Sequence, residues 1–250
     1  MKRLRNPING CPWDRKQSPH SLREYILEEA HELVEAIDMD SSQKQKEELG
    51  DLLLQIVFLS QIHREKGRFS IKEVIETINQ KLIQRHPHIF GDITVSSAEE
   101  VKQNWEKIKK KEKERKSIIS DYPAQMPALS HAKRVAEQAS SVGFDWDNPL
   151  GALEKIEEEI EELKKELQSG CKEKLEEEIG DLLFAVANVA RLAHINPEFA
   201  LKNTNKKFVS RFRYIEEQLH VQGKNIEETG MAEMEALWQE AKTVKNKNKS

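Results

Sequence analysis

Apolar residues recur every three or four positions along most of the chain, which is the period of one face of an α-helix. In the first such segment, Ser18-Pro19 offers an N-cap followed by proline at the first helical position. The apolar residues of this segment fall on roughly one helical face: Leu22, Ile26, Leu33 and Ile37. The run Asp40-Ser41-Ser42 breaks the pattern, so we expect the helix to end there.

The same period and the same start and stop signals predict further helices along the chain. A capping-box pair, Ser97 and Glu100, opens one of them, and asparagine–proline pairs at 148–149 and 196–197 open two others. The later helices are predicted at about 43–66, 71–85, 97 onward, 128–141, 149–168, 172–194, 197 onward, and over a last segment that contains Trp238. No strand-like alternation of any length occurs, so the sequence predicts an all-α protein.

The pattern occurs twice along the chain. A shift of 130 positions carries acidic residues of the first half onto identical residues of the second half, and the shift becomes 126 and then 133 further on. The matched pairs include Glu28 and Glu158, Glu29 and Glu159, Glu32 and Glu162, Glu48 and Glu178, Gly50 and Gly180, Asp51 and Asp181, Asn79 and Asn205, Lys81 and Lys207, Arg85 and Arg211, and Trp105 and Trp238. Because connections tolerate insertions, these small changes of shift indicate two copies of one helical unit.

The two copies define the predicted domains. An N-terminal helical domain covers residues 1–116, a connector with Pro123 and Pro127 covers 117–127, and a C-terminal helical domain covers 128–250. A helix pair alone buries its apolar faces poorly, so each copy needs a partner. Two arrangements are open: the copies pack on each other within the chain, or each packs on its counterpart in a second chain. Both give a helical bundle.

An acidic motif, E-E-x-x-E followed by E-x-G-D, occurs in both copies with identical spacing. Residues three apart share a helix face, and the short loop between the two helices predicts antiparallel neighbours. Four carboxylates of each copy should therefore converge, and cations relieve their repulsion. An all-oxygen set of this kind suits Mg²⁺, with Mn²⁺ as a substitute. The predicted ligands are Glu29, Glu32, Glu48 and Asp51 in the first copy and Glu159, Glu162, Glu178 and Asp181 in the second.

Two other interpretations of the acidic motif compete with a magnesium site. Glu-rich helices can simply display solvated charge, but here the spacing repeats without error beside strongly apolar runs. Gly50 and Gly180 also lie inside the predicted helices, where glycine costs about 1 kcal/mol relative to alanine. Such a cost indicates close approach of another helix or a ligand. A di-iron site would use the step Glu28-x-x-His31, but Glu161 replaces the histidine in the second copy.

Cationic and aromatic residues of the second copy complete the candidate site. Lys207 and Arg211 are four positions apart on one predicted helix, so both can reach one anion, and Asn205 could add a hydrogen bond. Beside a carboxylate–metal cluster, this pair indicates a phosphate chain held between metal and cations. Trp238 could stack on a base or belong to the core, and the sequence does not choose between these.

Composition and charge exclude several other classes of protein. The chain has 44 acidic and 40 basic residues, a balance that gives no general attraction for nucleic acid or an anionic membrane. The basic stretch 107–116 alternates with glutamates and is expected to be a solvated helix end. Cys11 and Cys171 form no C-x-x-C pair. Neither a signal-peptide core nor a run of about 18 apolar residues occurs, so we expect a soluble, cytoplasmic protein.

Together these motifs resemble the MazG family of nucleoside triphosphate pyrophosphohydrolases, in the all-α NTP pyrophosphatase superfamily. The resemblance covers almost the whole chain and rests on N-G-C-P-W-D at 9–14, the two acidic motifs and R-H-P-H at 85–88. It implies a helical, dimeric, Mg²⁺-dependent enzyme with a broad preference for nucleoside triphosphates, and within the family the C-terminal copy is usually credited with activity. It also implies metal ligands at Glu159, Glu162, Glu178 and Asp181, and nucleotide contacts at Lys207, Arg211 and Trp238.

The expected reaction is attack of a metal-activated water on the α-phosphorus, with pyrophosphate as the leaving group. Glu158 or Glu177 is the candidate general base. Lys155, Glu158 and Asn205 are further candidates for contact with the substrate. The alternative function is a non-enzymatic helical scaffold that binds a protein partner through its charged faces.

The sequence leaves open whether the first copy is active. All of its acidic residues are present, but Pro87 interrupts its third helix, whereas the matching helix of the second copy continues through Phe212 and Tyr214. This difference could alter the access of a nucleotide to one copy. The physiological nucleotide also stays open.

Overall fold

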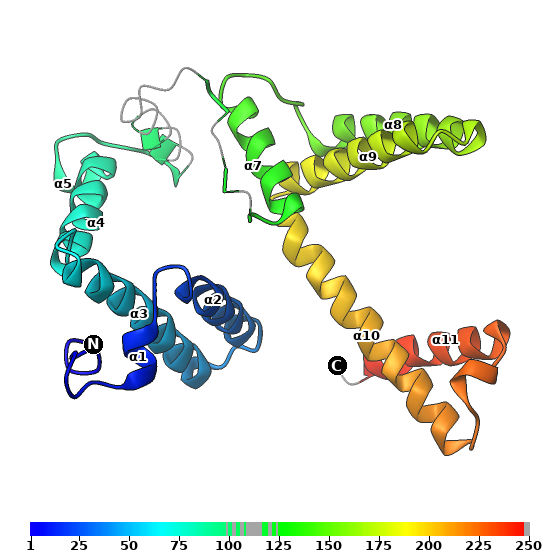
Figure 1. Ribbon diagram of the computed structural model, residues 1–250. Helices are drawn as coiled ribbons and strands as arrows, with labels where there is room; N and C mark the ends of the chain where they lie inside the picture. The colour runs from blue at the N-terminus through cyan, green and yellow to red at the C-terminus, as the bar shows by residue number, and fades with distance from the viewer. Residues whose placement is uncertain are drawn as a thin grey trace. The chain divides into compact units, whose positions relative to one another are not determined.

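The computed structural model describes residues 1–98, 100–101, 104–105, 108, 117–119, 122–123 and 125–247, with side chains through residue 243. Within these residues all regular structure is helical, which confirms the all-α prediction (Figure 1). The chain divides into two compact units, Met1–Ile108 and Lys109–Ser250, and each is described by itself. The predicted domain boundaries stay predictions. The basic stretch 107–116 lies outside the described residues apart from Ile108.

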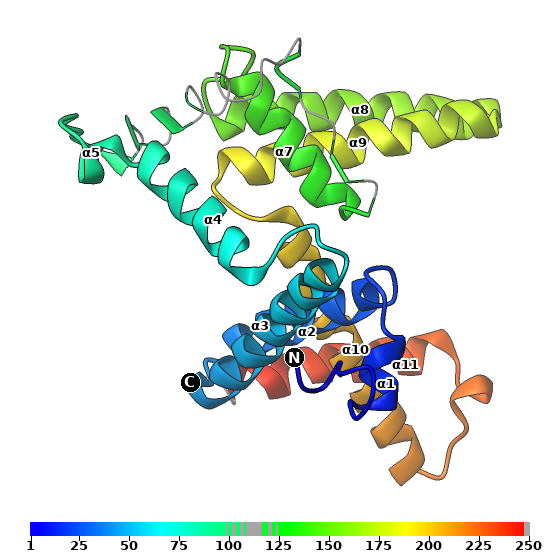
Figure 2. The same ribbon diagram turned by 60° about the vertical axis from the view of Figure 1, so that its left-hand side comes forward.

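The first unit is built on a pair of antiparallel helices. Its helices are α1 (Pro12–Lys16), α2 (Leu22–Asp38), α3 (Ser42–Glu65), α4 (Ile71–Arg85) and α5 (Pro87–Phe90). Helices α2 and α3 run side by side and are joined by a short turn, as the sequence predicts (Figures 1 and 2). The core lies between them, where Leu22, Phe58 and Ile62 are at most 3% exposed.

The start of α2 differs from the prediction. The sequence places the first helical residue at Pro19, whereas the helix begins at Leu22 with Ser21 as its N-cap. The cause is a pair of reciprocal hydrogen bonds between Ser18 and Ser21. Each backbone N–H donates to the other residue's hydroxyl oxygen, at 3.0 and 3.2 Å. These bonds close a separate turn before the helix, so the helix starts later than the proline suggests.

The second unit repeats the antiparallel pair and adds a longer arm. Its helices are α7 (Ala128–Ser140), α8 (Pro149–Ser169), α9 (Lys172–Leu192), α10 (Pro197–Val221), the short 3₁₀ helix η1 (Ile226–Glu228) and α11 (Met231–Lys247). Helices α8 and α9 run side by side, α7 packs on α9, and α11 packs on α10 (Figures 1 and 2). The core of the arm consists of Ile215, Leu219 and Leu237, with Trp238 packed against it.

The α3 and α9 helices end in the same backbone motif with different residues. In both, the residue after the C-cap has a positive φ: Gly67 in the first unit (64°) and His194 in the second (58°). The N–H of Ile195 then donates to the carbonyl of Ala190 at 2.7 Å. Glycine adopts this conformation freely, whereas other residues rarely do. The sequence therefore marks the first end clearly, but it placed the end of α9 at residue 194 instead of Leu192.

The third helices of the two copies differ as predicted. Helix α4 ends at Arg85, two residues before Pro87, and the four-residue α5 follows. Helix α10, its counterpart, continues without interruption for 25 residues. Among the described residues, no helix is long and apolar enough to cross a membrane.

Candidate metal centres

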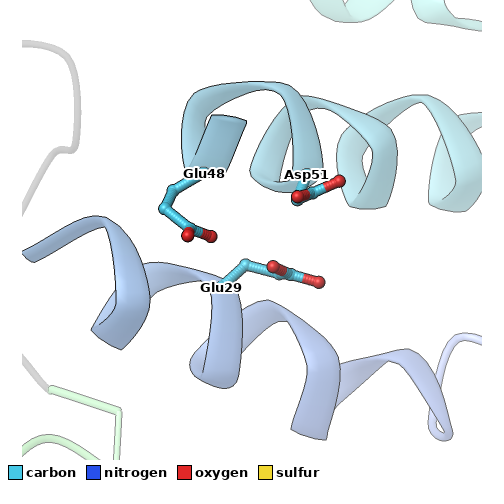
Figure 3. A group of neighbouring side chains, drawn as sticks. All are labelled: Glu29, Glu48 and Asp51. Carbon is cyan, nitrogen blue, oxygen red and sulfur yellow. The ribbon is translucent and has the colours of Figure 1, made fainter. Parts of the chain in front are cut away.

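Helices α2 and α3 bring together three of the four carboxylates predicted for the first copy. Glu29 comes from α2, Glu48 and Asp51 come from neighbouring turns of α3, and one carboxylate oxygen of each lies within 4.8 Å of the others (Figure 3). The antiparallel packing places Glu29 opposite both α3 residues. Glu32 lies one turn further along α2 and outside this group, although its charge still acts on Glu48.

The second copy forms the same group from α8 and α9. Single carboxylate oxygens of Glu159, Glu178 and Asp181 also lie within 4.8 Å of one another, and Glu162 lies outside the group. Glu159 is buried, at 4% exposure, whereas Asp181 is exposed. Because two different sequences reach one arrangement, the geometry follows from the spacing of the motif and the antiparallel pairing.

The pKa values of the glutamates reflect this crowding of negative charge. Burial raises the pKa of Glu48, and the neighbouring carboxylates, Glu32 first among them, raise it further. Burial and then the charge of Glu162 raise the pKa of Glu178 in the same way. For Glu29, burial raises the pKa more than hydrogen bonding lowers it. A bound cation would relieve this repulsion, and hard carboxylate oxygens fit Mg²⁺ or Mn²⁺.

The two groups differ in the residue that contacts their first glutamate. In the first copy, the Nε2 of Gln55 donates a hydrogen bond to Glu29 at 3.3 Å. In the second, the Nζ of Lys155 lies 2.8 Å from Glu159 and 2.9 Å from Glu158. Both bonds raise the pKa of Lys155. Sequence reasoning missed Gln55 and assigned Lys155 only to the substrate. The four-residue spacing from Lys155 to Glu159 was the available signal of an ion pair.

The predicted nucleotide contacts lie on α10 and α11. The Cζ of Arg211 lies 5.5 Å from the centroid of the Trp238 ring, in a cation–π arrangement. The ring of Trp238 also packs on Phe208, with centroids 5.0 Å apart, and on the core of the arm. Trp238 is therefore partly buried against the core of the arm, with the Arg211 guanidinium over its ring, and its contact with a base stays a prediction.

The acidic group of the second unit and the Arg211–Trp238 pair are separate features of this structure. In the part of the chain that is described, no hydrogen bond or ion pair joins the group to Lys207 or Arg211. Asn205 lines a hollow on a side of α10 that helical spacing places nearly opposite Lys207. Glu177 is exposed and outside the acidic group. The roles of all these residues stay predictions.

Comparison with known proteins identifies the family. The model of the MazG nucleotide pyrophosphohydrolase domain matches this chain twice, over residues 17–90 and 148–215. The chain therefore belongs to the MazG nucleotide pyrophosphohydrolase family. Each matched segment contains one of the three-carboxylate groups, which confirms the predicted duplication.

Curated relatives extend the similarity over nearly the whole chain. The nucleoside triphosphate pyrophosphohydrolase/pyrophosphatase MazG of Thermotoga maritima is 49% identical over 97% of this chain and 92% of its own length. A nucleoside triphosphate pyrophosphohydrolase of Escherichia coli K12 is 40% identical over 97% of this chain and 94% of its own length. The uncharacterized protein YabN of Bacillus subtilis is 43% identical over 99% of this chain, which matches 51% of YabN.

Proposed function

We propose that this protein hydrolyses nucleoside triphosphates to the nucleoside monophosphate and pyrophosphate. The observation that carries the proposal is the pair of three-carboxylate groups, one in each MazG domain segment. The names of the relatives from Thermotoga maritima and Escherichia coli support nucleoside triphosphates as the class of substrate.

The proposed cofactor is Mg²⁺, with Mn²⁺ as a substitute. Glu159, Glu178 and Asp181 would hold it in the second copy, with Glu162 beside them. When bound, the ion neutralises charge on the triphosphate and makes the attacking water more acidic. In the first copy, Glu29, Glu48 and Asp51 offer an equivalent set, with Glu32 beside them.

The chain's own residues position the substrate and move the proton. Water forms a bond to the α-phosphorus, and the bond from that phosphorus to the bridging oxygen of the departing pyrophosphate breaks. Glu158 and Glu177 lie outside the acidic group, so they are the candidates to accept the proton of the water. The guanidinium of Arg211 binds phosphate oxygens with good directional match. The proposed substrate contacts are Lys155, Glu158, Asn205, Lys207, Arg211 and Trp238.

The identity of the products tests this function. With ATP and Mg²⁺, the primary products should be AMP and pyrophosphate, because the reaction breaks the bond between the α- and β-phosphates. Anion-exchange chromatography of samples from early time points separates them from ADP and orthophosphate. A preparation of the Glu159→Gln variant, purified in parallel, controls for contaminating hydrolases. ADP with orthophosphate as the first products would exclude a pyrophosphohydrolase.

We also propose that the protein works as a homodimer. Matched positions of α3 and α9 carry large apolar side chains whose exposure lies between 42% and 56%: Leu49, Leu53, Leu54 and Ile56 in the first unit, and Ile179, Leu183, Phe184 and Val186 in the second. Gly50 and Gly180 lie among them, and a Cβ at either would meet nothing within 4 Å. Within either unit, none of the described residues makes the close approach that the sequence predicts at these glycines. A second chain that covers these faces supplies it and buries the apolar surface.

Charge placed on these faces tests the dimer. The variant with both Leu53→Glu and Leu183→Glu should elute as a monomer, while the wild type should have twice the 29.0 kDa mass of the chain in multi-angle light scattering. Leu150→Glu is the matched control, because Leu150 is also exposed but lies outside these faces. A monomeric wild type at micromolar concentration would favour packing of the two copies within one chain instead.

A further inference from the structure

The second acidic group already contains a cation of its own. The carboxylate of Glu159 is almost fully buried, and the Nζ of Lys155 lies 2.8 Å from one of its oxygens. The same ammonium lies 2.9 Å from Glu158. Lys155 therefore compensates a carboxylate that water barely reaches, at the position where we place a metal ion.

Among the residues that the structure describes, no lysine or arginine contacts the first acidic group. The residue that matches Lys155 under the shift of 130 is Tyr25, which packs against the core of its unit and lies 5.8 Å, between ring centroids, from Trp13. The partner of Glu29 is the neutral amide of Gln55. The charged groups that act on Glu29 and Glu48 are all carboxylates. The two groups thus offer similar carboxylates, but the contacting partner of the first glutamate is neutral in the first group and positively charged in the second.

We propose that Lys155 is a built-in counter-cation of the second site, which a divalent ion must displace. This inference rests on the proposed function, since it assumes that both acidic groups bind metal. An ion held by the same oxygen of Glu159 would lie within about 5 Å of the ammonium and be repelled by it. In the first site, none of the described residues would repel the ion in this way. The first site of the chain therefore fills at a lower concentration of Mg²⁺ than the second. The rate of hydrolysis at the second site then rises with the concentration of free Mg²⁺.

Binding of Mn²⁺ to the full-length chain without nucleotide, followed by electron paramagnetic resonance, tests this proposal. The Glu29→Gln background weakens the first site, so that the second is observed by itself. In that background, Lys155→Met removes the charge at similar length and should tighten Mn²⁺ binding about tenfold or more. Lys155→Arg keeps the charge and should bind Mn²⁺ as the background does.

Thermal unfolding gives a second readout that does not depend on activity. Without metal, Lys155→Met should lower the Tm, because the buried Glu159 loses its partner. Saturating Mn²⁺ should then raise the Tm of this variant by more than it raises that of the background. The reciprocal change, Tyr25→Lys in a Glu159→Gln background, places the ammonium in the first site and should weaken Mn²⁺ binding there. If Lys155→Met does not fold without metal, Tyr25→Lys still tests the effect of a lysine charge on Mn²⁺ binding.

The outcomes separate this inference from the proposed function. Unchanged or weaker Mn²⁺ binding by Lys155→Met, with Lys155→Arg equal to it, would overturn the role of Lys155 while metal-dependent hydrolysis still stands. An absence of Mn²⁺ binding to the wild type at millimolar concentration would remove the metal from both acidic groups and overturn the inference and the proposed chemistry together.

Discussion

Removal of divalent metal should reduce the hydrolysis of ATP to background, and added Mg²⁺ should restore it. The carboxylates of Glu159, Glu178 and Asp181 converge without any compensating cation other than Lys155 among the described contacts. Alone, they would repel a triphosphate, and in the proposed reaction the ion would offset this repulsion and make the attacking water more acidic. The measurement is the rate of AMP formation by chromatography in excess EDTA and after addition of Mg²⁺.

Circular dichroism in EDTA provides the control for this experiment. We expect the helices to persist without metal, because the cores around Leu22 and Leu219 do not involve the acidic groups. A loss of activity with intact helices would then show that the metal is needed for the reaction and not for the folding of the helices. Full turnover in excess EDTA would show that the carboxylates do not act through a metal.

Glutamine in place of Glu159 is expected to lower kcat severely, whereas Glu29→Gln should leave most of the activity. Loss of one carboxylate would weaken the proposed metal site and displace the attacking water, and a shift of about 1 Å can cost on the order of a hundredfold in rate. The two substitutions are matched, because each removes one charge at an equivalent position with little change of shape.

The asymmetry between the copies is the reason to expect different effects. In the second copy, α10 continues past Arg211, which lies over the ring of Trp238. In the first, the helix ends at Arg85, and the matching tryptophan, Trp105, contacts the ring of His86 instead, with centroids 5.3 Å apart. Steady-state rates of both variants, compared after circular dichroism confirms their folding, show which copy carries the hydrolytic activity. Equal losses would mean that both copies act or share a site, and a large loss from Glu29→Gln alone would place the chemistry in the first copy.

Most of the helices could be predicted from the sequence, because apolar period and capping residues act locally. The capping box of Ser70 and Glu73 fixes the start of α4 within the first unit. Prediction failed where two candidate caps compete, or where a residue adopts a conformation that is rare for its type. The start of α2 depends on two serines that bond to each other, and the end of α9 depends on His194 in a conformation that glycine usually adopts.

The candidate metal site was predictable for a similar reason, up to a limit. Spacing along one helix places Glu48 and Asp51 on one face, but it does not determine which glutamate of the facing helix lies opposite both. The structure selects Glu29 and leaves Glu32 beside the group. Contacts between helices, such as Gln55 with Glu29, leave no mark in the spacing of one segment. The cation–π contact of Arg211 with Trp238 likewise could not be read from the spacing of one segment.

The position of an oxygen label tests the central claim most directly. Hydrolysis of ATP in ¹⁸O-labelled water with Mg²⁺ should place the label in AMP, because in the proposed reaction water attacks the α-phosphorus, at a site where Glu159, Glu178 and Asp181 would hold the metal. Mass spectrometry of both products should find the pyrophosphate unlabelled. Label in pyrophosphate, with AMP unlabelled, would show attack on the β-phosphorus and contradict the proposed mechanism.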